Sequence, residues 1–430
     1  MTMTLAFLAS RKGYLKVMGS LIQAALDRGH RVVLLRDPAQ KKPGEATTDA
    51  DFRAWPGATL VDCGWGDPLR PPLTAHGAQA LVGPSLHWVL QSMGRVDEAA
   101  EIARAGVRLY SVDYAFETVT SDPAGYRVVD VTFYQSAFQR ELHWSQPRHR
   151  AWTGDFVTLR RELDLGSRSA VSGSTMLDQR ARVRDLEAVR RKYGIPARAP
   201  VVLFMPPKMA VPDPWRTFVW GDSWRARRDA LLSRPAAAGA LAATIFVGLL
   251  DRRRHGNGYR RLLESVRRFC ERSEAVLVVK SRQKNEDPAF LRDFTPHIVE
   301  RDEDVFPYTS IELMAIADLC IHFQSGAVLE AAFCGVPSLS VKLPPPYDRD
   351  NPAYEELWDA EPGTFHNWEG VVWSARPGDV TTLLAEGKLD AFAIEPRARR
   401  AYVERYLGFD DTASSERVLD VIERRASRAG

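Results

Sequence analysis

One segment of the sequence has the residue types and the spacing of a phosphate-binding turn. The apolar run 319–323 predicts a strand, and Ser325 and Gly326 open a helical pattern that ends at Gly335. The N–H groups and the positive dipole end at a helix start favour a phosphate, and a glycine lets it approach the backbone. Glu330, one turn further on, could accept hydrogen bonds from ribose hydroxyls. The same spacing also fits an ordinary strand-to-helix turn in which Glu330 is a solvated or capping acid.

The elements that must position this turn form a regular alternation of short apolar runs and helical patterns. In the first half, predicted strands lie at 4–9, 31–36, 80–82, 107–112 and 128–134, with Gly29 closing the first helix. A second series lies at 201–205, 275–280, 297–299, 319–323 and 338–341. This alternation predicts an α/β fold of two doubly wound, Rossmann-like domains that face each other across a cleft.

The expected boundaries follow from composition. We expect a first domain over 1–178, a linker helix over 179–199 and a second domain over 200–397, followed by a helical segment, 398–430, that packs back on the first domain. The linker lies in an amphipathic stretch, 176–193, that Gly194 and Pro196 terminate. A Trp- and Arg-rich insertion at about 209–260 interrupts the second series.

Composition excludes several classes of protein. The 430 residues include 58 Lys and Arg against 55 Asp and Glu, a net charge of +3, which is too balanced for a nucleic-acid-binding surface. The 4 cysteines form no C-x-x-C pair, which predicts reduced core thiols rather than a zinc site or disulfides. The first residues lack a basic leader, and the longest apolar stretch, 236–250, is shorter than the ~20 residues that span a bilayer. We therefore expect a cytoplasmic protein.

Four segments together resemble one family. The Ser-Gly-x-x-x-Glu-Ala-x-x-x-Gly-Val-Pro pattern at 325–337 resembles the donor-binding segment of GT-B glycosyltransferases, and the opening strand, loop and helix ending Arg28-Gly-His-Arg-Val32 look like their N-terminus. Val171-Ser-Gly-Ser-Thr-Met-Leu-Asp178 resembles a V-x-G-x-x-x-x-D segment of polysaccharide-type GT-B enzymes, nonhydrolysing UDP-sugar 2-epimerases and CDP-glycerol glycerophosphotransferases. The run 409–418 is similar to the terminal D-G-x-(A/S)-S-x-R-(I/V) segment of surface-polysaccharide transferases, with Asp411-Thr412 where Asp-Gly is usual. No single motif is diagnostic, but the resemblance covers nearly the whole chain in order.

The resemblance implies a bacterial enzyme that holds a nucleotide-sugar donor in the second domain and a glycan or lipid-linked acceptor on the first, with no metal or other cofactor. It places the donor contacts in four segments of the second domain. These are Lys208; Lys280, Ser281 and Arg282; Tyr308; and the turn of Gln324, Ser325 and Gly326 with Glu330 in the helix that follows. A cation near the diphosphate would stabilise the leaving nucleotide. Tyr308, in a segment that resembles the cradle of the base, either stacks on the base or packs in a core. In the first loop, Arg11, Lys12 and Gly13 are expected to contact the acceptor or the donor phosphates.

A transferase of this kind also needs a base to deprotonate the acceptor hydroxyl. The candidates are His87, Asp113 and Glu117, each of which follows a predicted strand of the first half. A lone histidine or loop acid is more often structural than catalytic, so the three remain alternatives.

Two other features have competing interpretations. The segments 302–304 and 348–350 have the D-x-D form that holds a metal–nucleotide complex in GT-A transferases, but their position late in the second domain favours ordinary loop charges. The Trp/Arg insertion is predicted to be a covering subdomain, and the alternative is peripheral contact with the inner face of the membrane.

The sequence therefore favours a metal-independent glycosyltransferase of bacterial surface-polysaccharide biosynthesis. A CDP-alcohol polyol-phosphate transferase is the alternative, weakened because Lys280-Ser-Arg-Gln-Lys284 replaces the usual Lys-x-His-Pro. A UDP-sugar 2-epimerase is less favoured, and a catalytically silent scaffold is the third reading.

Overall fold

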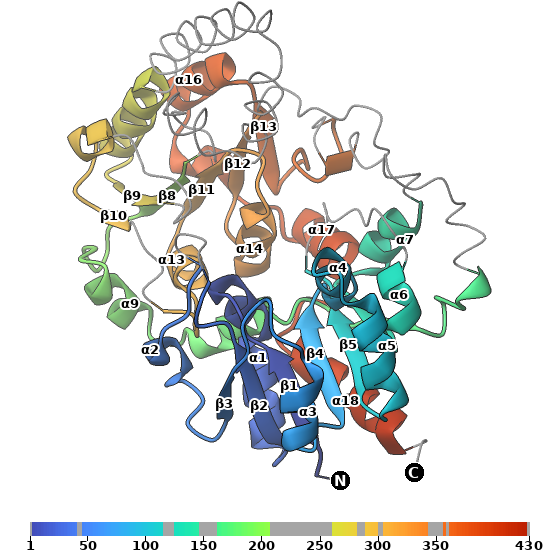
Figure 1. The fold of residues 1–430 in the computed structure, drawn as a ribbon. Helices are drawn as coiled ribbons and strands as arrows, with labels where there is room; N and C mark the ends of the chain where they lie inside the picture. The colour runs from blue at the N-terminus through green and yellow to red at the C-terminus, as the bar shows by residue number, and fades with distance from the viewer. Residues whose placement is uncertain are drawn as a thin grey trace, which may run out of the picture.

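The computed structural model describes residues 2–40, 45–114, 124–145, 161–206, 260–281, 289–299, 304–342, 356–357 and 361–427. Within them the chain forms two parallel sheets, and Figure 1 shows the corresponding domains one above the other, with both chain ends on the far side of the first.

The first sheet has 7 strands in the order β3-β2-β1-β4-β5-β6-β7. Its strands are β1 (Thr4–Leu8), β2 (Arg31–Arg36), β3 (Thr59–Asp62), β4 (Ala80–Pro84), β5 (Arg108–Val112), β6 (Val131–Tyr134) and β7 (Ser169–Val171). Every neighbouring pair is parallel, and Leu5 of β1 lies opposite both Val32 and Ala80. The order reverses at β1 and β4, as in a doubly wound sheet.

Helices cover both faces of the first sheet. Leu5 and Phe7 point into a core formed with α1 (Lys12–Asp27) and α18 (Ser414–Ser427), whereas Ala6 and Leu8 point into the opposite core. That second core contains residues of α3 (Arg70–Ala75), α4 (Leu86–Ser92) and α5 (Val96–Arg104). Other helices in the described ranges of this domain are α2 (Asp49–Phe52), α6 (Ala124–Val128) and α7 (Ala137–Ser145).

The second sheet has 6 strands in the order β10-β9-β8-β11-β12-β13, all parallel, and reverses at β8 and β11. Its strands are β8 (Val201–Met205), β9 (Val276–Lys280), β10 (Ile298–Val299), β11 (Leu319–His322), β12 (Ser338–Val341) and β13 (Val372–Ala375). One face packs on α13 (Thr309–Ala315), α14 (Ala327–Cys334) and α17 (Pro396–Leu407). The other packs on a helix over 260–272, α16 (Pro377–Glu386) and the 3-10 turns η3 (Ala289–Asp293) and η4 (Leu389–Phe392). The two doubly wound sheets predicted from the sequence are confirmed.

The segment between the sheets differs from the single helix expected over 176–193. The structure divides it into η1 (Leu177–Arg182) and α9 (Leu186–Lys192). The break has a local cause, because the carboxylate of Asp185 accepts a hydrogen bond from the Ala188 N–H at 2.8 Å and so caps a new helix. The amphipathic pattern continues through this N-cap and therefore does not show the break.

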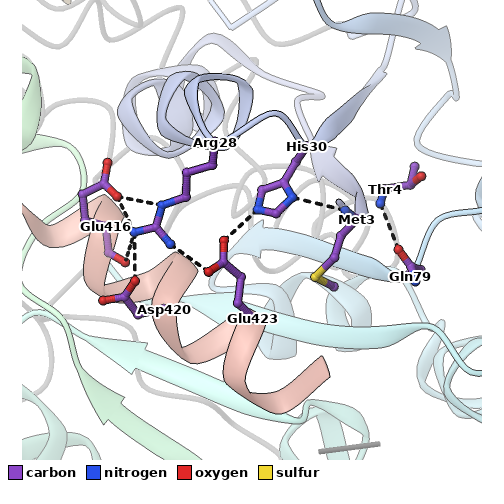
Figure 2. A network of polar contacts seen from close by, with 8 residues as sticks. All are labelled: Met3, Thr4, Arg28, His30, Gln79, Glu416, Asp420 and Glu423. Carbon is purple, nitrogen blue, oxygen red and sulfur yellow. Dashed lines mark hydrogen bonds and ion pairs between the residues drawn. The ribbon is translucent and has the colours of Figure 1, made fainter. Parts of the chain in front are cut away.

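The end of the chain returns to the first domain. Helix α17 lies between α14 of the second domain and α7 of the first, and α18 packs along α1. Figure 2 shows Arg28, at the end of α1, paired with Glu416, Asp420 and Glu423 of α18. The buried His30 ring accepts a hydrogen bond from the Met3 N–H at 3.2 Å and lies 2.8 Å from Glu423 (Figure 2).

Two of the sequence motifs meet at the start of α18. Asp178 is buried, and its carboxylate accepts hydrogen bonds from the backbone N–H groups of Ser414 at 3.1 Å and Ser415 at 2.6 Å. Gly173 has a φ of +87°, and a Cβ there would collide with the Ser414 hydroxyl. The V-x-G-x-x-x-x-D segment and the C-terminal segment therefore form one clasp, in which Asp178 caps the last helix.

Candidate functional site

Strained turns mark the place where each sheet reverses. Ser85 follows β4 with a φ of 41°, and Gln324 follows β11 with a φ of 37°. A left-handed backbone costs a residue other than glycine about 1–2 kcal/mol, and such strain concentrates at functional sites. In doubly wound sheets, ligands bind at the carboxyl ends of strands at these reversal points. The two turns therefore define the candidate site in each domain.

The turn after β11 leads into α14 as the sequence predicted. Gly326 is the N-cap residue and Gly335, in the left-handed conformation, ends the helix. Gly326 has an ordinary φ of −57°, and a Cβ built on it would have no atom within 4 Å. Glu330 lies in the first turn of α14 and is half-buried. The structure thus brings Ser325, Gly326 and Glu330 to one open turn.

Behind this turn lies a buried polar cluster that the sequence analysis did not identify. His322 ends β11, and its Nδ1 accepts a hydrogen bond from the Ser325 N–H at 3.4 Å. The ring of His366 lies 5.7 Å from that of His322, and its Nδ1 lies 3.2 Å from the Ser340 hydroxyl of β12. Burial, with a smaller contribution from His322, lowers the pKa of His366 well below its ordinary value. The position of His322 inside an apolar run was the only sequence signal.

The other donor-side residues have different environments. Lys280 is buried at the end of β9, and its Nζ donates to the Ser281 carbonyl at 2.8 Å. Gln324 is buried beside Ser325. Tyr308 is 1% exposed in the core of the second domain, and its N–H donates to Gln179 Oε1 at 3.0 Å.

Several predicted residues lie outside the described part of the chain. These are Glu117, Lys208, Arg282, the insertion from 209 to 259, and the D-x-D acids Asp302, Asp348 and Asp350. Asp304 is described, and its carboxylate pairs with Lys192 Nζ at 2.7 Å. Among the described residues no group of three or more His, Cys, Asp or Glu side chains is arranged to hold a metal ion.

Two of the candidate bases belong to one buried network at the carboxyl ends of β4 and β5. The Ser85 hydroxyl donates to Asp113 Oδ1 at 2.9 Å, and Asp113 Oδ2 lies 3.1 Å from His143 Nδ1. His87 Nδ1 lies 2.9 Å from the Ser111 hydroxyl, and its ring stacks on Tyr126 with centroids 4.3 Å apart. His143 comes from α7, so only the fold could reveal it as the partner of Asp113.

Burial and charge act in opposite directions in this network. Burial lowers the pKa of His87 to about 4, although the charge of Asp113 opposes the shift. Burial alone would raise the pKa of Asp113, but His143, with smaller contributions from His87 and the Ser85 hydroxyl, outweighs it, and the net pKa lies below the ordinary value. His87 is 1% exposed, and its Nε2 has no hydrogen-bond partner in the described ranges. At neutral pH the arrangement is a carboxylate close to the imidazole of His143, with the uncharged ring of His87 nearby.

The first loop joins this edge of the sheet. The Arg11 guanidinium lies 4.8 Å from the Trp65 ring and 5.5 Å from the Tyr14 ring. Lys12 pairs with Asp51 at 3.3 Å. A Cβ on Gly13 would lie 3.3 Å from Glu45 Oε2, so the glycine leaves room for a carboxylate against the first turn of α1. The predicted loop residues therefore lie beside an acid and two aromatic rings that the sequence analysis had not singled out.

Comparison with known proteins supports the fold. No protein-family model and no curated protein matches the sequence. Among solved structures, UDP-GlcNAc 2-epimerase from Methanocaldococcus jannaschii is 10% identical with a TM-score of 0.57, over 98% of this chain and 100% of that one. S. aureus MnaA, in a co-structure with UDP, is 11% identical with a TM-score of 0.55, and the match covers 99% of this chain and 97% of MnaA. The wall teichoic acid polymerase TagF is 11% identical with a TM-score of 0.54, and the match covers 100% of this chain and 89% of the TagF chain.

Identities this low establish architecture rather than activity. The chain has the GT-B fold, with two Rossmann-like domains, as the sequence predicted. Every helix in the described ranges is too short or too polar to cross a lipid bilayer.

Proposed function

We propose that the protein is a metal-independent glycosyltransferase that moves a sugar from a nucleotide donor to a glycan or lipid-linked acceptor in bacterial surface-polysaccharide biosynthesis. The observation that carries the proposal is the open turn at Ser325 and Gly326, at the reversal point of the second sheet, with Glu330 one turn away. Backbone N–H groups at a helix start bind phosphate without any metal ion.

The donor is assigned to the second domain. Ser325 and Gly326 contact its phosphates, Gln324 fixes the turn, and Glu330 accepts hydrogen bonds from the ribose. Lys280, Ser281, Arg282 and Lys208 supply charge and hydrogen bonds around the leaving nucleotide. Tyr308 is assigned to the support of the base-binding segment, because its ring is buried in the core. A structural relative with the same fold was crystallised with UDP-GlcNAc and UDP, which supports a nucleotide-sugar ligand.

The acceptor is assigned to the first domain, with the base chosen among His87, Asp113 and Glu117. In the described geometry Asp113 is the central member, because its carboxylate accepts a hydrogen bond from the Ser85 hydroxyl and lies 3.1 Å from His143 Nδ1. Asp113 and His143 are buried, so an acceptor hydroxyl reaches Asp113 only if the domains move. Without such a movement the two side chains support the end of β5 rather than contact the acceptor. Arg11, Lys12 and Gly13 face the acceptor or the donor phosphates from the first loop.

Gly326 provides the sharpest test of the donor site. Because its φ is ordinary and the space around a Cβ is empty, Gly326→Ala is compatible with the fold and changes the unfolding free energy by less than about 1 kcal/mol. A methyl group at this position would nevertheless hold a phosphate away from the backbone. Gly378→Ala is a matched control, since Gly378 also opens a helix and has empty space around its Cβ position.

The measurement is thermal stabilisation by UDP, GDP, CDP, CMP and dTDP. A ligand at 100 times its Kd stabilises by about 2.7 kcal/mol. We expect one nucleoside diphosphate to stabilise the wild type and Gly378→Ala, and not Gly326→Ala or Glu330→Ala. Equal stabilisation of all four proteins would refute the assigned donor site. If none of the five nucleotides stabilises the wild type, the result would favour a catalytically silent scaffold.

Polyol-phosphate transfer from a CDP-alcohol is the second candidate, and the structural similarity to TagF favours it. The same panel separates it from sugar transfer. Stabilisation by CMP alone would indicate a CDP-alcohol or CMP-sugar donor, because CMP is the nucleotide that such a donor releases.

A further inference from the structure

Exposed aromatic rings stand next to the buried polar network of the first domain. Three large hydrophobic side chains are exposed in the described ranges, Trp88 at 36%, Tyr114 at 39% and Leu186 at 39%. Trp88 directly follows His87, and Tyr114 directly follows Asp113. Because β4 and β5 are paired parallel neighbours, the segments that carry Trp88 and Tyr114 both begin at the carboxyl edge of the first sheet. Exposed aromatic rings gathered beside polar groups mark a binding surface.

Arg11 lies at the same edge, after β1, which is the other neighbour of β4. Its guanidinium makes no hydrogen bond and no ion pair within the described part of the chain, and its Nε is buried without a partner. Tyr14 and Trp65 flank the group, so its orientation is fixed while its N–H groups are unused. A planar guanidinium held in this way is suited to a carboxylate or a phosphate, which it binds through two parallel hydrogen bonds.

The surroundings decide between a sugar and a hydrocarbon. Burial of its hydroxyl end raises the pKa of Tyr114 to about 12, with smaller contributions from Tyr14, Asp113 and Glu45 and an opposing one from Arg11, so the phenol lies among polar and charged groups. A lipid chain laid across Tyr114 would remove water from them without offering hydrogen bonds, which is costly. A sugar ring instead presents an apolar C–H face to an aromatic ring and hydroxyl groups at its rim. The occupant with matching chemistry is therefore a carbohydrate with a negative group.

We propose that the acceptor is an acidic glycan, with its sugar ring on Trp88 and Tyr114 and its carboxylate or phosphate on Arg11. The inference rests on the proposed function, in which the first domain holds the acceptor. It adds the chemical class of that acceptor and the residues that select it.

The test is binding of the full chain to immobilised oligosaccharides in matched sets: a uronic-acid-containing glycan, a sugar-phosphate-containing glycan and the neutral counterpart of each. The wild type is expected to bind at least one acidic set at least tenfold more tightly than its neutral counterpart, and the set bound identifies carboxylate or phosphate. Arg11→Gln should remove this preference and leave neutral binding unchanged. Trp88→Ala and Tyr114→Ala should weaken binding to acidic and neutral glycans alike by about tenfold, as loss of an aromatic stacking contact does.

Leu186→Ala is the matched control, because Leu186 is equally exposed but lies on α9. Equal binding of acidic and neutral glycans by the wild type, or no glycan binding, would overturn the inference. So would an Arg11→Gln variant with unchanged glycan binding and weaker binding of a nucleoside diphosphate, since the guanidinium would then serve the donor. Glycan binding without any nucleotide binding would refute the proposed sugar transfer and leave only the acidic-glycan site, whereas nucleotide binding without a preference for acidic glycans would refute the inference alone.

Discussion

The buried His87 should make the stability of the first domain depend on pH between about 6.5 and 4. Its folded-state pKa of about 4 lies below the ordinary value of 6.5, because burial disfavours the imidazolium. The unfolded chain therefore binds a proton that the folded chain does not. The stabilisation is complete above the unfolded pKa and is lost as the pH falls toward the folded pKa.

The magnitude follows from these two values. Proton linkage gives a loss of about 2 kcal/mol at about pH 5 and a negligible loss at about pH 7.5. His87→Gln removes the titration and keeps a side chain that can bond the Ser111 hydroxyl. The variant is less stable at neutral pH, by the lost ring stacking on Tyr126 of about 0.5–1.5 kcal/mol. Its stability should nevertheless fall less steeply with acid.

The assay is urea unfolding of both proteins at several pH values, followed by tryptophan fluorescence. Subtracting the variant's pH profile from that of the wild type cancels the titration of other groups, including His366. We expect a difference of about 2 kcal/mol to develop between neutral pH and about pH 5. Parallel profiles would refute the reasoning, because His87 would then have an ordinary pKa and could not be the buried, uncharged ring described above.

Three further predictions concern the clasp at the start of α18. Asp178→Ala leaves two buried N–H groups unpaired and should lower the free energy of thermal unfolding by about 2–3 kcal/mol. Asp185→Ala removes an exposed helix cap and should lower it by about 1 kcal/mol, so equal losses in the two variants would contradict the clasp. Gly173→Ala combines backbone strain with a collision against Ser414, whereas Gly194→Ala, at a φ of +67°, adds only strain of about 1 kcal/mol. The melting temperature of Gly173→Ala should therefore be clearly lower than that of Gly194→Ala. Deleting 414–430 removes the helix that covers one face of the first sheet, and an unchanged melting temperature would show that α18 is not part of that core.

Local sequence patterns predicted most strands of the two sheets, because parallel strands that are buried on both faces consist of short apolar runs. The predicted run 338–341 coincides with β12, and 275–280 differs from β9 by one residue. The glycines at 29 and 335 were identified as helix ends, and both have the expected positive φ. Strands β3 and β13 were missed, because β3 is only half-buried and mixes polar residues, and β13 follows an irregular segment.

The site was less accessible to sequence reasoning, because its partners are distant along the chain. Asp113 and His87 were identified from their places after strands, but the pairing of Asp113 with His143 depends on how α7 packs. The cluster of His322 and His366 joins residues from two separate loops of the second domain. Turns at strand ends can be located from local pattern, whereas the groups that converge on them are set by tertiary structure.

The most direct test of the account is turnover with a nucleotide sugar and an acceptor glycan. The full chain would be incubated with UDP-, GDP-, CDP- and dTDP-sugars and an acidic glycan that it binds, and the products would be separated by chromatography and weighed by mass spectrometry. The account predicts a glycan heavier by one sugar residue together with release of the nucleoside diphosphate, both lost in Glu330→Ala. Conversion of the donor to an isomer of equal mass, with no change in the glycan, would contradict it and indicate an epimerase.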